Sequence, residues 1–103
     1  MDTSLNGRTA LITGGSLGLG LAMAKSFYSE GAKVVIIARR QEPINEAVSE
    51  ISKLSGDGSI MGISCDVTDA ESVSSMHSQV TKEFGGIDIL VNNAGQAAGK
   101  PFP

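Results

Sequence analysis

The stretch Thr13-Gly-Gly-Ser-Leu-Gly-Leu-Gly20 decides the fold of this chain. It follows a short, apolar and β-branched run, Thr9 to Thr13, which is typical of a buried strand. It leads into a segment from Leu19 to Glu30 that is apolar almost all round, which predicts a helix packed on several sides. Glycines between a strand and a helix permit a tight turn and let a phosphate approach backbone N–H groups at the helix N-terminus. The stretch therefore predicts a phosphate-binding turn inside a βαβ unit.

Each glycine of this loop has an expected task. Gly14 makes the turn, Gly18 permits the close approach of the phosphate, and Gly20 lets the helix pack on the sheet. A Walker loop needs Gly-Lys-Ser/Thr at its end, and Leu21 follows Gly20 instead. The common Gly-x-Gly-x-x-Gly pattern fails as well, because Met23 stands where its third glycine belongs. The alternative is a loop that is rich in glycine only for tight packing.

The rest of the chain alternates between strand and helix patterns. Three further apolar segments predict strands: Val34–Ala38, Ser59–Ser64 and Ile87–Val91. Two segments between them carry apolar residues at helical spacing: Ile44 to Leu54 and Val73 to Phe84. This alternation predicts an α/β fold, a partial Rossmann-type parallel sheet of about four strands in the order 3-2-1-4 with three helices.

Composition argues against several functional classes. Eight basic and eleven acidic residues give a net charge of −3, which argues against nucleic acid or an anionic membrane as the main partner. The polar start, Met1 to Gly7, has no apolar secretory core, so a cytoplasmic chain is expected. The single cysteine, Cys65, excludes an internal disulfide framework and a cysteine-based zinc cluster, and no metal site is expected.

Three motifs at strand ends carry a resemblance to a known family. The glycine loop, Asp66-Val67 after the third strand and Asn92-Asn-Ala-Gly95 after the fourth follow one another in order. With them the chain resembles the N-terminal, cofactor-binding half of the short-chain dehydrogenases/reductases. The extended branch of that family would show Thr-Gly-x-x-Gly-x-x-Gly, and Leu17 occupies the position of its middle glycine, so the compact branch is favoured. The resemblance implies an incomplete dinucleotide-binding segment over residues 1–95 and a tail over 96–103.

The resemblance also implies roles for single residues. The loop residues that would line the pyrophosphate and the nearby ribose are Ser16, Leu17 and Leu19. The adenine amino group would be bound by Asp66, with Val67 beside the ring. The residues after the fourth strand would serve the adenosine ribose, brace the sheet and let the cofactor pass close to backbone: Asn92, Asn93, Ala94 and Gly95. The alternative for Asp66 is a helix-capping acid, because Thr68-Asp-Ala-Glu71 matches a capping box with Thr68 as N-cap.

The residues after the second strand favour one dinucleotide over the other. An NAD site places Asp or Glu about 20 residues beyond the glycine loop, where it holds the ribose 2′-hydroxyl. Here Arg39 and Arg40 stand at that place. A guanidinium can bind a 2′-phosphate through paired charge-assisted hydrogen bonds, so NADP(H) is favoured over NAD(H). The alternative is that both arginines only solvate a helix start, and the nearby Glu42 is able to pair with one of them.

The resemblance implies an NAD(P)-dependent oxidoreductase that acts on an alcohol or carbonyl substrate. The family's catalytic Asn, Ser and Tyr-x-x-x-Lys lie beyond this chain, and the only tyrosine, Tyr28, is followed four residues later by Ala32. The 103 residues alone are therefore expected to be inactive. The alternative is a catalytically dead NADP-binding or interaction module. The expected partner is a small-molecule dinucleotide, and a homo-oligomer would form through the family's later helices. The segment Ile87–Val91 is expected to be a bare apolar edge.

Overall fold

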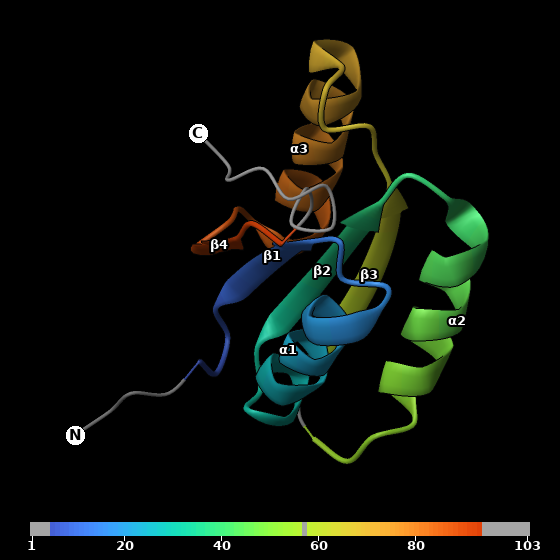
Figure 1. Ribbon diagram of the computed structural model, residues 1–103. Helices are drawn as coiled ribbons and strands as arrows, with labels where there is room; N and C mark the ends of the chain where they lie inside the picture. Colours follow the sequence, from blue (N-terminus) through green and yellow to red (C-terminus); the bar gives the residue numbers. More distant parts are fainter. Residues whose placement is uncertain (1–4, 57, 94–103) are drawn as a thin grey trace.

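The computed structural model describes residues 5–56 and 58–93, which form one parallel sheet with helices on both faces (Figure 1). The elements follow in the order β1 (Thr9–Thr13), α1 (Gly18–Ser29), β2 (Lys33–Ala38), α2 (Gln41–Ser52), β3 (Ser59–Ser64), α3 (Ala70–Phe84) and β4 (Ile89–Val91). The strand order is β3-β2-β1-β4, and all three pairings are parallel. The α/β fold with the strand order 3-2-1-4 predicted from the sequence is confirmed.

The two central strands are buried on both faces because helices cover each side of the sheet. Ile12, Val34 and Ile36 pack under α1 and α2. Leu11, Val35 and Ile37 point to the opposite face, which α3 covers with residues such as Met76 and Val80. Alternate residues of one strand therefore belong to different cores, which explains why β2 is apolar at nearly every position. No helix within the described residues is long and apolar enough to cross a membrane.

The fourth strand is shorter than the pattern from Ile87 to Val91 predicts. Asp88 is the reason, because its carboxylate takes over part of the strand pairing. Its Oδ2 accepts a hydrogen bond from the Thr9 N–H at 2.8 Å, while its own N–H donates to the Thr9 carbonyl at 2.9 Å. Regular pairing with β1 begins only at Ile89, which lies opposite Ala10. The Asp88 side chain thus links the residue before β4 to the first residue of β1, but it does not extend the regular backbone pairing of the two strands.

Among the described strands, β4 forms one edge of the sheet, and Leu90 on it is 56% exposed. An open apolar edge is a template for pairing with another chain. We expect Leu90→Lys to reduce concentration-dependent association while changing the free energy of unfolding by no more than about 0.5 kcal/mol. Sedimentation velocity over a series of concentrations measures the effect. Identical sedimentation of the two proteins would show that this edge does not drive association.

Candidate functional site

The loop after β1 turns at the carboxyl edge of the sheet. Gly14 has φ +66°, a left-handed conformation that favours glycine, and its N–H donates to the Ile37 carbonyl at 2.8 Å. This hydrogen bond ties the turn to the end of β2. Gly18, at the start of α1, has φ +58°, and a β-carbon there would meet open space. Gly14 therefore makes the turn as the sequence predicts. At Gly18 the backbone conformation requires glycine, and the space next to its α-carbon is open.

The helix that follows lies very close to the strand ends. A β-carbon on Gly20 would press on the Gly14 carbonyl and stand 2.8 Å from Nδ2 of Asn93. A β-carbon on Gly15 would lie 2.6 Å from Cγ2 of Ile36. Gly20 thus allows the close packing that the sequence predicts. The crowding at Gly15 was not predicted, because it depends on a side chain of the neighbouring strand.

The N-terminus of α1 has no side-chain cap. Its N-cap residue is Leu17, which is extended and whose side chain has no hydrogen-bond acceptor, and the first turn contains no acidic residue. The first N–H groups of a helix have no partner within the helix, and the helix dipole makes this end attractive to an anion. Leu17 and Leu19 are 69% and 63% exposed, whereas Ser16 is buried. The loop therefore offers backbone N–H groups between exposed apolar side chains.

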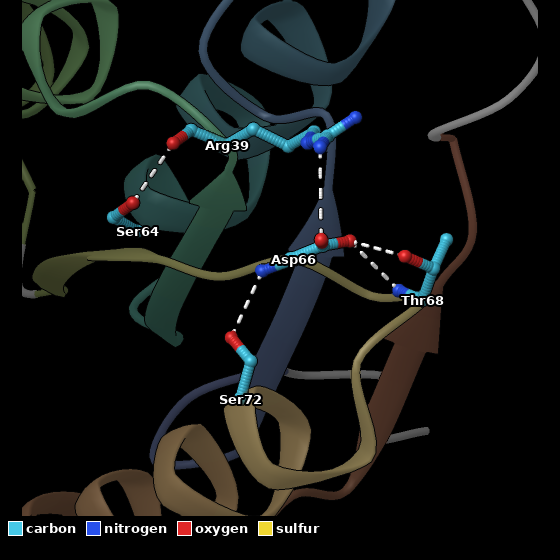
Figure 2. Close-up of polar contacts among 5 residues, drawn as sticks. All are labelled: Arg39, Ser64, Asp66, Thr68 and Ser72. Carbon is cyan, nitrogen blue, oxygen red and sulfur yellow. Dashed lines mark hydrogen bonds and ion pairs between the residues drawn. The ribbon is translucent and has the colours of Figure 1, made fainter.

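Two arginines follow β2 at the same edge of the sheet. Arg39 is fixed through its backbone, whose carbonyl accepts a hydrogen bond from the Ser64 hydroxyl at 2.9 Å (Figure 2). Its side chain is 76% exposed. Arg40 is the N-cap residue of α2 and is exposed. Among the described residues, Glu42 forms no ion pair with either arginine, so this part of the alternative interpretation finds no support.

Asp66 follows β3 and receives hydrogen bonds from the next turn (Figure 2). Its Oδ1 accepts from the Thr68 hydroxyl at 2.6 Å and from the Thr68 N–H at 3.0 Å. Its backbone N–H donates to the Ser72 hydroxyl at 3.0 Å. Its Oδ2 lies 3.6 Å from Nη2 of Arg39. These contacts hold a carboxylate beside a guanidinium at the ends of two neighbouring strands.

The capping box predicted from Thr68 is wrong. The N-cap of α3 is Asp69, whose Oδ1 accepts from the Glu71 N–H at 3.2 Å. Thr68 lies one residue before this N-cap, and its hydroxyl donates to Asp66. Asp66 is not the helix cap either, so the alternative role considered for it is not the one it has.

The hydrogen bonds from the Thr68 hydroxyl and N–H, together with the Arg39 charge, hold the pKa of Asp66 below its usual value of 3.8. A lowered carboxyl pKa stabilises the fold above the unfolded value of 3.8, and this contribution is lost as the pH falls through the lower folded value. We expect the side-chain carboxyl carbon of Asp66 to titrate below pH 3.8 in NMR spectra. Thr68→Val removes the largest cause, so the midpoint should rise. A midpoint unaffected by this substitution would contradict the assignment.

The segment after β4 is fixed to the first strand by Thr13. The Thr13 hydroxyl donates to the Val91 carbonyl at 3.3 Å and accepts from the Asn93 N–H at 2.7 Å. These two hydrogen bonds place Asn93 against Gly20. The neighbouring Asn92 is exposed. Thr13 was not among the predicted site residues, although it begins the glycine motif. Ala94, Gly95 and the predicted tail lie outside the described residues.

The predicted site residues thus meet at one edge of the sheet. The glycine loop, Arg39, Asp66 and Asn93 all follow the carboxyl ends of parallel strands. In open α/β sheets, ligands bind outside this edge where the strand order reverses, which here is between β1 and β4. The edge combines uncapped helical N–H groups for a phosphate with exposed cations. In residues 5–56 and 58–93, no three His, Cys, Asp or Glu side chains gather as a metal site.

The sequence profile of the short chain dehydrogenase family matches residues 8–103. The chain therefore belongs to this family, whose members among its relatives are oxidoreductases. An uncharacterized oxidoreductase of Mycobacterium bovis is 42% identical over 97 residues, which make up 92% of this chain and 37% of the relative.

Solved structures of related proteins are similar to this chain in both sequence and fold. The structure of L-sorbose reductase from Gluconobacter frateurii, complexed with NADPH and L-sorbose, is 40% identical with a TM-score of 0.83 over 92% of this chain and 36% of that protein. A metagenomic short-chain oxidoreductase in complex with NADP is 35% identical with a TM-score of 0.82 over 90% of this chain and 41% of that protein. The chain spans well under half the length of each of these proteins.

Proposed function

We propose that this chain binds NADP(H) and is the cofactor-binding portion of an oxidoreductase that acts on an alcohol or carbonyl substrate. The observation that carries the proposal is the position of Arg39. It stands just past β2, where an NAD site places a carboxylate, and 76% of its side chain is exposed. Arg40 adds a second exposed cation next to it.

The residues at the carboxyl edge fit the parts of such a dinucleotide. A pyrophosphate fits the N–H groups at the start of α1, where the Leu17 side chain supplies no competing acceptor and Gly18 leaves the approach open. Asp66 and Val67 are assigned to the adenine, and Asn92 to the adenosine ribose. Asn93, held by the Thr13 hydroxyl, would brace the sheet. When bound, the nicotinamide would exchange a hydride with the substrate.

Two solved relatives support the choice of cofactor. The reductase from Gluconobacter frateurii was crystallised with NADPH, and the metagenomic oxidoreductase with NADP. Their likeness to this chain covers 92% and 90% of it. We propose the segment 1–95 as the unit that binds.

The dissociation constants of NADPH and NADH, measured with the chain by isothermal titration calorimetry, test the proposal. We expect NADPH to bind more tightly. Equal affinities, or tighter binding of NADH, would overturn the assignment of Arg39. The absence of binding for both nucleotides would overturn the proposed function as a whole.

The second candidate is a catalytically dead NADP-binding or interaction module. Among these 103 residues the one tyrosine, Tyr28, is buried within α1, away from the carboxyl edge where hydride transfer would occur. The intact mass of the protein in its native source separates the two. A mass well above 10.6 kDa supports the oxidoreductase, and a mass of 10.6 kDa supports the binding module.

A further inference from the structure

The guanidinium proposed to hold a 2′-phosphate already faces an anion of its own chain. Nη2 of Arg39 lies 3.6 Å from Oδ2 of Asp66. Figure 2 shows the arginine side chain reaching across from the end of β2 toward the carboxylate at the end of β3. Among the described residues, this is the ion pair at the carboxyl edge; the pair of Lys25 and Glu50 joins α1 to α2 instead.

The two partners are not equally free to move. Asp66 is held by the Thr68 hydroxyl and N–H on its Oδ1 and by Ser72 on its backbone N–H. These contacts leave Oδ2 directed at Arg39. Arg39 is fixed at its carbonyl by Ser64, but its side chain extends into solvent. The carboxylate is therefore the stationary member of the pair, and the guanidinium is the member that can turn to a ligand.

We propose that Asp66 is a specificity-determining residue that weakens the preference for NADP(H) over NAD(H) by competing with the 2′-phosphate for Arg39. This inference rests on the proposed function. Without a 2′-phosphate, Asp66 balances the Arg39 charge, so an unphosphorylated ribose does not leave an unpaired cation. With a 2′-phosphate, the guanidinium must either turn away from the Asp66 carboxylate or pair with the carboxylate and the phosphate together. In the second case, the carboxylate and the phosphate repel each other.

The size of the effect follows from the exposure of the pair. The Arg39 side chain is 76% exposed and that of Asp66 is 37% exposed, so solvent screens their attraction. Removing the carboxylate should therefore change the ratio of the NADH to the NADPH dissociation constant by about two- to fivefold, the range of a single exposed ion pair. The ratio rises, because only the phosphorylated nucleotide gains from the freed guanidinium.

The test compares this ratio in the wild-type chain and in Asp66→Asn. Asparagine keeps an oxygen for the hydrogen bonds from Thr68 and removes the charge, and any loss of adenine binding cancels in the ratio. Asp66→Ser provides a second neutral variant. Glu83→Gln is the matched control, because it removes one negative charge from an exposed position near the opposite end of α3. We expect the ratio to rise in both Asp66 variants and to stay unchanged in Glu83→Gln.

A double-mutant cycle shows whether Asp66 acts through Arg39. In an Arg39→Ala background, Asp66→Asn should alter the ratio much less than in the wild type. An equal change in both backgrounds, or no change in the wild-type background, would overturn the inference while leaving the proposed function intact. If the wild-type chain binds neither nucleotide, the proposed function fails and the inference fails with it.

Discussion

Replacing Gly20 with valine should abolish dinucleotide binding and lower the free energy of unfolding by about 2–3 kcal/mol. A β-carbon at this position presses on the Gly14 carbonyl. Because this carbonyl belongs to the backbone, no side-chain rotation can relieve the clash. Relief requires the start of α1 to move away from the strand ends. That movement would also displace the N–H groups proposed to hold the pyrophosphate.

Gly85→Ala is the matched control for the loss of a glycine. Gly85 has φ +91° at the C-terminus of α3, and a β-carbon there meets open space. The substitution should cost about 1–2 kcal/mol of stability through backbone strain and leave the affinity for NADPH unchanged. Urea denaturation and calorimetry measure both quantities. A Gly20→Val chain with wild-type stability and affinity would show that close packing of α1 is not what this glycine provides.

Arg39→Ala should weaken NADPH binding by about 10- to 100-fold, because hydrogen bonds to charged groups contribute about 1.5–3 kcal/mol. The affinity for NADH should change by no more than about threefold, since only the competing ion pair with Asp66 is lost. Calorimetric titration of both nucleotides measures the two effects.

Lys53→Ala serves as the control for lost positive charge. Lys53 is exposed and follows the C-terminal end of α2, whereas Arg39 precedes its N-terminal end. This variant should bind both nucleotides as the wild type does. An Arg39→Ala chain that loses NADPH and NADH to the same extent would place the arginine elsewhere than at the 2′-phosphate.

The sequence was sufficient for the fold because local patterns determine it. A strand apolar at nearly every position, such as Val34–Ala38, belongs in a sheet covered on both faces, and the glycine loop identifies which strand precedes the phosphate turn. The positive φ angle at Gly14 was predictable for the same reason, since only the turn and its own residue are involved.

The contacts that the sequence did not predict join residues far apart in the chain. Asp88 takes over a β1 hydrogen bond 79 positions away and shortens β4. The Arg39–Asp66 pair and the Ser64–Arg39 hydrogen bond link the ends of neighbouring strands. The capping box failed at Thr68 for a local reason: its hydroxyl donates to Asp66, and Asp69 is the residue that accepts from the N–H of Glu71 at the helix start. The pattern of apolar and polar residues along the sequence does not determine which partner such a polar side chain takes in the folded chain.

The central claim, that a phosphorylated dinucleotide lies along the carboxyl edge of this sheet, is tested most directly by titrating the ¹⁵N-labelled chain with NADPH and following its backbone amide signals. We expect the largest shifts at Gly14–Gly20, Arg39, Arg40 and Asp66, with small shifts at residues near the opposite edge such as Gly7 and Gly85. Uniformly small shifts, or shifts centred on the opposite edge, would contradict the claim.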